Sequence, residues 1–346
     1  MDKLEETILK YKSKKFLVIE PGGNNGDRLI YWGMEKKLKE FGIDYAVLQY
    51  NEVPWFPFLH KLHFGLWKRI LNITEVVSKS NSGLKVAINK LDKRVYERTI
   101  KVDKICAGSS LVILIHGGGN INDLWHGIRL LRNVIQHNRN SIVIVGPQTY
   151  WFQETCFPEL FQVAKREIYL FCREKYSYNL LNSMDLPENI HVHLCHDTTF
   201  YLSKEDFHPR ESIYDLICLR TDKESAIFRK KGNSKGLQRI GMKGLKKPLE
   251  RVLVWDISLI ANFRDFLHLV EGSRKVYTDR LHVAILAALL GKDTTLYPNS
   301  YYKNKGVYEY SLFDYPNVKF VDAPKHLEEI ETMLEFQSTT FDRGEI

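Results

Sequence analysis

The chain has 346 residues, of which 44% are hydrophobic and 27% charged, with a formal net charge of +8. These values indicate a globular protein of two domains, because a single core rarely grows past about 250 to 300 residues. Between Arg229 and Arg251, nine Lys or Arg residues stand against one acid, Glu250. Because this basic segment lacks interleaved stacking aromatics, it argues against nucleic-acid binding and favours contact with a phosphate or an anionic membrane surface.

The cysteines do not suggest a disulfide framework. They are odd in number and far apart, which favours a reducing compartment, and they are Cys106, Cys156, Cys172, Cys195 and Cys218. Residues 1–15 are charged and have neither the apolar core of a signal peptide nor a membrane-spanning length. We therefore expect a cytoplasmic protein, with peripheral contact at the inner membrane face through residues 229–251 as a further hypothesis.

The N-terminal part alternates short apolar runs with helical patterns such as Arg28–Phe41, which predicts a parallel, doubly wound sheet. The predicted strands are Phe16–Glu20, Leu111–Ile115, Ser141–Val145, Ile168–Phe171 and Val192–Cys195. Residues 51–108 are less regular and rich in aromatics, a composition that suits core packing, an acceptor-side lid or a membrane-dipping helix.

A second series of the same kind follows Phe200, with helices expected at Ser258–Glu271 and Leu281–Leu290. Its predicted strands are Asp215–Leu219, Lys275–Tyr277, Thr294–Tyr297 and Val318–Val321. We predict an N-terminal domain of residues 1–205 and a C-terminal domain of residues 206–346. In α/β proteins ligands bind at the carboxyl ends of the strands, so we expect the chemistry between the two domains.

The first motif, Gly22-Gly23-Asn24-Asn25-Gly26-Asp27, lies between a predicted strand and a predicted helix. A glycine turn that leads into a helix brings backbone amides close to a ligand and favours an anion. The spacing fails the dinucleotide pattern G-x-G-x-x-G, because Asn24 replaces the second glycine. A ligand site involving Asn24 and Asp27 and a plain strand-to-helix turn are both consistent with this motif.

The second motif, His116-Gly117-Gly118-Gly119-Asn120, also follows an apolar strand. Three glycines such as Gly118 would leave room for a sugar or phosphate beside His116 and Asn120. A lone histidine is often structural, but its position at a strand's carboxyl end makes His116 a candidate site residue.

The third motif, Thr278-Asp279-Arg280-Leu281-His282, comes at the end of a predicted strand. Arg280 and His282 would lie on the first turn of a helix, where a cation, the helix dipole and free amides can hold a phosphate. The alternative is that Asp279 only caps the helix and Arg280 lies on the surface.

Weaker candidates also follow strands. Arg173 and Asp197 would more often serve as an ion pair or cap than as ligand contacts. Strand alternation places His191, His193 and Cys195 on one face, a pattern worth testing for a metal, but no second ligand cluster accompanies them and we predict ordinary packing and no metal.

Taken in order, GGNNGD at 22–27, HGGGN at 116–120, GPQT at 146–149, REKYS at 173–177 and TDRLH at 278–282 resemble the polysaccharide pyruvyltransferase family. The resemblance implies two facing Rossmann-like domains similar to B-type glycosyltransferases. It also implies transfer of pyruvate from phosphoenolpyruvate to two hydroxyls of a sugar in a capsule, exopolysaccharide or cell-envelope glycan, with release of phosphate and without a cofactor.

The resemblance further implies roles for single residues. The C-terminal domain would be the donor side, with His282 as catalytic acid and Arg280 binding the donor. Arg173 and Asn120 of the N-terminal domain would also bind the donor. In the N-terminal, acceptor-side domain, His116 would be the base. The remaining wall of the site would comprise Asn24, Asp27, Gly118 and Asp197, although the sequence departs from the family's D-P-x-F pattern at 195–200, which puts Asp197 in doubt.

Two other functions fit parts of the pattern. A B-type glycosyltransferase that uses a nucleotide sugar would share the fold and the glycine-rich strand ends. A non-catalytic subunit that binds a glycan or lipid phosphate would retain the fold, but it would have no evident use for both histidines.

Overall fold

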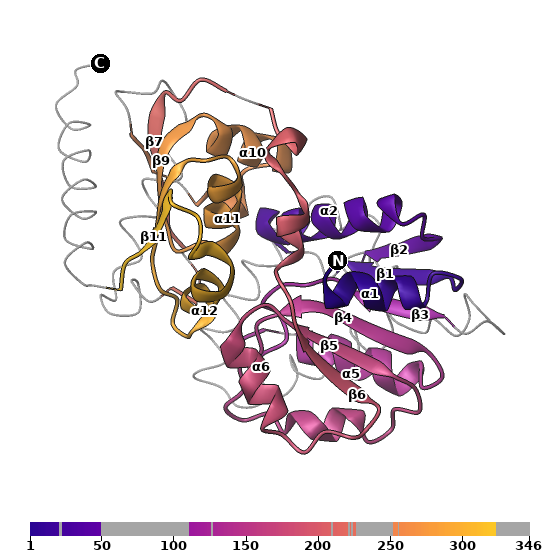
Figure 1. Cartoon of the computed structure of the whole chain (residues 1–346). Helices are drawn as coiled ribbons and strands as arrows, with labels where there is room; N and C mark the ends of the chain where they lie inside the picture. Colours follow the sequence, from indigo (N-terminus) through magenta and orange to yellow (C-terminus); the bar gives the residue numbers. More distant parts are fainter. Residues whose placement is uncertain are drawn as a thin grey trace, which may run out of the picture. The chain divides into compact units, whose positions relative to one another are not determined.

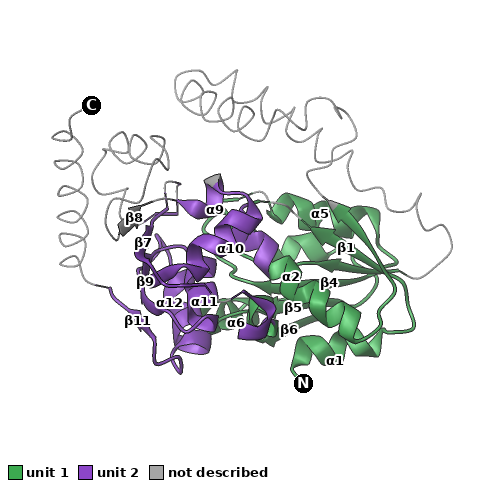
Figure 2. Cartoon of the chain, turned by 90° about the horizontal axis from the view of Figure 1, so that it is seen from above, with its two compact units in different colours: residues 1–23, 30–201 green, residues 24–29, 202–346 purple. Residues whose placement is uncertain are grey.

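The computed structural model describes residues 1–20, 23–49, 111–125, 127–208, 210–220, 222, 224–225, 252–254 and 256–322. The chain forms two compact units, one of residues 1–23 and 30–201 and the other of residues 24–29 and 202–346 (Figure 2). The sequence placed the boundary after residue 205 and kept residues 24–29 in the first domain. The aromatic-rich stretch 51–108 and the basic segment 229–251 lie outside the described residues.

The first unit contains a six-stranded parallel sheet with the strand order β2-β1-β3-β4-β5-β6 (Figure 1). Its central strands are buried residue after residue instead of alternating, as expected for a parallel sheet covered on both faces. The strands are β1 (Phe16–Glu20), β2 (Tyr45–Gln49), β3 (Val112–Ile115), β4 (Ile142–Gln148), β5 (Ile168–Cys172) and β6 (Ile190–Leu194).

Helices pack on both faces of this sheet, and each face has its own hydrophobic cluster. Leu4 and Ile8 of α1 pack into one cluster, and Leu131 and Val134 of α5 into the other. The helices are α1 (Lys3–Lys10), α2 (Asn25–Glu40), α5 (Gly127–His137) and α6 (Lys175–Asn182), with short 3-10 turns at Phe157–Phe161 and Thr198–Tyr201. The first residues of α2, 25–29, and a further 3-10 turn at Lys204–Asp206 group with the second unit.

The second unit contains a five-stranded parallel sheet with the order β11-β10-β9-β7-β8. Its strands are β7 (Tyr214–Cys218), β8 (Val252–Val254), β9 (Ser273–Thr278), β10 (Asp293–Leu296) and β11 (Val318–Phe320). Its helices are α9 (Ile257–Ile260), α10 (Phe263–Glu271), α11 (Leu281–Leu289) and α12 (Lys303–Val307), followed by a π-helical turn at Tyr308–Leu312. The predicted α/β class with two Rossmann-like units is thus confirmed.

Two details differ from the sequence expectations. The single helix expected over Ser258–Glu271 is interrupted, because Ala261 is extended and Asn262 begins α10 by accepting a hydrogen bond from the Asp265 amide at 2.9 Å. Arg280, not Asp279, is the N-cap residue of α11. Within the described part of the chain, no helix is long and apolar enough to cross a membrane.

Candidate functional site

In the first unit, the HGGGN loop after β3 is joined to the GPQT segment at the end of β4. Gly118 forms a parallel bridge with Gln148, and its amide donates to the Pro147 carbonyl at 2.8 Å. Gly118 has φ 142°, a conformation that favours glycine. A Cβ atom on Gly117 would lie 2.6 Å from the Pro147 carbonyl oxygen. The space beside Gly117, where the sequence suggested room for a ligand, is therefore occupied by the backbone of Pro147.

His116 and Asn120 lie at the two ends of this loop. The His116 side chain is fully buried, and its Nδ1 is 2.6 Å from the Gly117 carbonyl oxygen. Because a carbonyl only accepts, this contact favours the tautomer with hydrogen on Nδ1 and a lone pair on Nε2. The Asn120 amide donates to Gln148 Oε1 at 3.3 Å, and the Asn120 side chain is only half-buried.

Arg173 and Asp197, predicted separately, form one buried ion pair. Arg173 Nη1 lies 2.8 Å from Asp197 Oδ2, with the two side chains 1% and 0% exposed. Arg173 Nε also donates to Thr149 Oγ1 at 2.9 Å, and Asp197 Oδ1 accepts from the Thr199 amide. The pair therefore joins the ends of β4, β5 and β6 at one edge of the sheet.

Glu174 and Ser177 of the REKYS motif continue this polar edge. The buried Glu174 carboxylate accepts from the Ser177 amide at 2.9 Å and from its hydroxyl, capping α6. The Tyr150 amide in turn donates to Ser177 Oγ at 2.8 Å. Burial raises the pKa of the Glu174 carboxyl, although its bonds to Ser177 oppose the shift.

In the second unit, residues 24–27 of the GGNNGD motif form the start of α2. The Asn24 amide donates to Asp27 Oδ2 at 2.9 Å, and Asn24 Oδ1 accepts from the Gly26 amide at 2.8 Å. These reciprocal bonds cap the helix. The buried Asn25 amide group donates to the carbonyls of Ile257 and Ala261 at 3.1 and 2.8 Å. Asn24 and Asp27 thus have a clear structural role at this helix start.

Gly26 lies directly against His282. A Cβ atom on Gly26 would lie 2.7 Å from His282 Nδ1 and 2.9 Å from His282 Cβ. His282 is half-buried on the first turn of α11, which has no acidic residue. The motifs around residues 26 and 282, far apart in sequence, therefore lie together within one compact unit.

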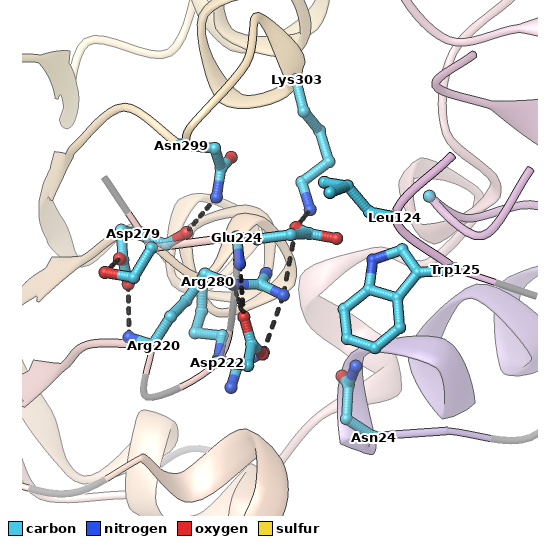
Figure 3. A network of polar contacts seen from close by, with 12 residues as sticks. Asn24, Leu124, Trp125, Arg220, Asp222, Glu224, Asp279, Arg280, Asn299 and Lys303 are labelled. Carbon is cyan, nitrogen blue, oxygen red and sulfur yellow. Dashed lines mark hydrogen bonds and ion pairs between the residues drawn. The ribbon is translucent and has the colours of Figure 1, made fainter. Parts of the chain in front are cut away.

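Arg280 does not lie on the surface but in a buried network of charges (Figure 3). Its Nε and Nη2 bind Asp256 at 3.0 and 2.6 Å, and its Nη1 lies 3.0 Å from Asp222 Oδ2. The surrounding carboxylates outweigh the effect of burial and raise the pKa of the Arg280 guanidinium. Burial alone would raise the pKa of Asp222, but Arg280 and Arg220 lower it well below its usual range.

Sequence reasoning did not find the rest of this network. Arg220 binds both oxygens of Asp222 at 2.9 and 3.0 Å, and Glu224 pairs with Arg220 and with Lys303. A signal for Arg220 was available, because it directly follows the predicted strand Asp215–Leu219. Asp256 had no such signal, because the strand before it, β8, is only three residues long.

The Asp279 carboxylate is buried, and it is bound by a backbone amide and by the Ser225 hydroxyl. Its Oδ1 accepts from the Arg220 backbone amide at 2.6 Å, and the backbone carbonyl of Asp279 accepts from Asn304 Nδ2 at 2.8 Å. Burial raises the pKa of the Asp279 carboxyl to about 6, against the opposing charge of Arg220.

The histidine run in β6 makes other contacts. His191 pairs with Glu167, and His193 packs against Tyr169 and Phe171. Across the ranges that the structure describes, no three His, Cys, Asp or Glu side chains are grouped so as to hold a metal ion.

Residues 24–301 match the family model described as polysaccharide pyruvyl transferase. The chain belongs to this family. It is also 23% identical over 237 residues to EpsO of Bacillus subtilis (strain 168), a protein named as a pyruvyl transferase, with 61% of this chain and 73% of EpsO covered. Membership of this family supports a role in pyruvyl transfer.

One solved structure supports the fold. A protein of uncharacterised function from Klebsiella pneumoniae subsp. pneumoniae NTUH-K2044 matches with a TM-score of 0.56 and 23% identity, over 93% of this chain and 100% of that one. The spinosyn rhamnosyltransferase SpnG, complexed with spinosyn aglycone, matches with a TM-score of 0.31 and 12% identity, over 85% of this chain and 83% of that one.

Replacing Asp197 with Ala should destabilise the pyruvyl transferase strongly. The change leaves the Arg173 guanidinium buried without its carboxylate, which costs about 3 to 5 kcal/mol. Urea unfolding measures the loss. Asp215→Ala is the control, because its partner Arg274 is 45% exposed and such pairs contribute up to about 1 kcal/mol. Equal losses in the two variants would contradict this account of the Arg173–Asp197 pair.

Asp279→Asn should change how stability depends on pH. The pKa of Asp279 is raised to about 6 in the folded protein, so the cost of its buried charge is absent below about pH 4 and complete above pH 6. Relative to the Asn variant, the wild type should therefore lose on the order of 3 kcal/mol between pH 4 and pH 7. Urea unfolding across this range is the measurement, with exposed Asp293→Asn as control. A difference that does not vary with pH would refute the prediction.

Proposed function

We propose that this pyruvyl transferase uses phosphoenolpyruvate as donor and forms a cyclic pyruvate ketal on two hydroxyls of one sugar, releasing phosphate. The family match over residues 24–301 carries the proposal. The acceptor is proposed to be a sugar of a capsular, exopolysaccharide or cell-envelope glycan, free or linked to a lipid. No cofactor is required, because the donor supplies both the carbon unit and the leaving group.

The start of α11 is the proposed donor site. Its first turn has no acidic residue and carries His282, and the positive end of a helix favours a phosphate or carboxylate. The predicted donor contacts Arg280 and Arg173 already have carboxylate partners, Asp256 and Asp197. The helix amides and His282 are therefore the better candidates for direct contact with the donor.

The chemistry needs one acid and one base. His282 would protonate the methylene carbon of the donor while a sugar hydroxyl adds to C2 and loses its proton. The resulting tetrahedral carbon carries the phosphate. Departure of phosphate and attack by the second hydroxyl, which also loses its proton, then close the ketal ring.

His116 is the proposed base. Its Nδ1 contact with the Gly117 carbonyl favours a basic Nε2, the kind of orientation by a third group that activated bases use. The other predicted site residues would act by shaping the loops that hold His116 and His282. They are Asn24, Asp27, Gly118, Asn120 and Asp197. Contact of residues 229–251 with an anionic membrane remains a prediction.

Phosphate release from phosphoenolpyruvate should depend on the sugar acceptor. A panel of galactosides, glucosides and N-acetylhexosaminides, free and lipid-linked, would be tested, and the product should gain the mass of pyruvate less one water. Because His282 is the proposed acid, His282→Gln should abolish release without lowering the melting temperature. If a nucleotide sugar is consumed instead, the proposed donor is wrong.

Gly26→Ala should reduce activity more than stability. Alanine raises helix propensity by up to about 1 kcal/mol, but its Cβ would displace His282, and a displacement near 1 Å can slow an enzyme about 100-fold. The matched control is Gly42→Ala. Gly42 has φ 64° and open space around it, so alanine there should lower the melting temperature while each folded molecule stays active. Normal turnover by Gly26→Ala would contradict the placement of His282 in the site.

A further inference from the structure

Every nitrogen of the Arg280 guanidinium lies at a carboxylate. Asp256 accepts hydrogen bonds from Nε and Nη2, and Asp222 forms an ion pair with Nη1. Arginine uses the same two-nitrogen fork to bind a phosphate or carboxylate ligand. A donor could use the fork only by displacing Asp256, whose side chain is 2% exposed.

Asp256 has its own unusual position. It is the N-cap residue of α9, but its carboxylate makes no capping bond there and binds Arg280. The carbonyl of the next residue, Ile257, accepts from the Asn25 side chain. The neighbouring residues Asp256 and Ile257 therefore bind Arg280, which precedes α11, and Asn25, the first residue of α2.

Those two helix starts meet at His282. Arg280 precedes α11 by one residue, its amide donates to Thr278 Oγ1 at 2.9 Å, and His282 is two residues further along. On the α2 side, Gly26 follows Asn25 and lies against the His282 ring. A shift of either helix start would therefore move the surroundings of His282.

We propose that Asp256 is a positioning residue for catalysis, which acts through Arg280 and, with Ile257, fixes both helix starts around His282. Arg280 then serves to hold the start of α11 and does not bind the donor directly. This inference rests on the proposed function, because it assumes that His282 is the reacting group.

The two possible roles of Arg280 predict opposite effects of Asp256→Asn. If Arg280 bound the donor, loss of the competing carboxylate would free its fork and lower the KM for phosphoenolpyruvate. If the pair positions His282, Asp256→Asn should lower kcat about 10- to 100-fold with little change in KM. Arg280→Gln should have the same effect, and the double variant should be no worse than the poorer single variant, because all three variants lose the Asp256–Arg280 interaction.

The experiment is a double-mutant cycle of Asp256→Asn and Arg280→Gln, with kcat and KM for phosphoenolpyruvate measured for each protein. Asp215→Asn, in the exposed pair with Arg274, is the control. The imidazole resonances of His282 are recorded in the unliganded variants, and both single variants should shift them. A lower KM in Asp256→Asn together with a higher KM in Arg280→Gln would overturn the proposal.

Two further arms keep the result decisive. Asn25→Ala loosens the same anchor without leaving a buried charge unpaired, and it should also lower kcat at constant KM even if Asp256→Asn does not fold. If the wild type does not turn over phosphoenolpyruvate, the proposed function fails, and the His282 resonances still test the positioning. Unchanged resonances in Asp256→Asn, Arg280→Gln and Asn25→Ala would refute it.

Discussion

Charged side chains buried at the ends of parallel strands need ion-pair or hydrogen-bond partners, and this constraint organises both units. A buried guanidinium or carboxylate without a partner is too costly for a marginally stable fold. Arg173 therefore has Asp197, and Arg280 has Asp256 and Asp222. Each pair joins loops that follow different strands, so it fixes the loops as well as neutralising the charge.

Pairing also decides which groups remain available for chemistry. Arg173 and Arg280, the most evident anion binders in the sequence, form ion pairs with carboxylates. The histidines are held differently, with His116 oriented through one ring nitrogen and His282 lying against Gly26. In this account the charged network provides rigidity, and the histidines with helix amides provide the reaction. Such a division is expected where catalytic groups need precise orientation more than extra charge.

The sequence predicted the strands best where both faces are buried. The run Phe16–Glu20 was predicted with its exact limits because its first four residues are all apolar and buried. The edge strand β2 and the three-residue strand β8 have weaker patterns and were missed. The break at Ala261 was missed because Asn262 caps a helix inside an otherwise helical pattern.

Site residues were predictable as positions but not as contacts. Glycine runs and strand ends pointed to His116, Arg173, Asp197, Arg280 and His282. The pairing of Arg173 with Asp197 depends on β5 and β6 being neighbours, and the meeting of Gly26 with His282 depends on the first turn of α2 grouping with the second unit. Such relations arise from the tertiary fold, and no local pattern encodes them.

The most direct test of the central claim is a titration of the protein with phosphoenolpyruvate while the His282 imidazole resonances are recorded, assigned by their absence from His282→Gln. The account predicts a saturable shift of these resonances with phosphoenolpyruvate and none with uridine or guanosine diphosphate. Saturable perturbation by a nucleoside diphosphate, with phosphoenolpyruvate inert, would contradict it.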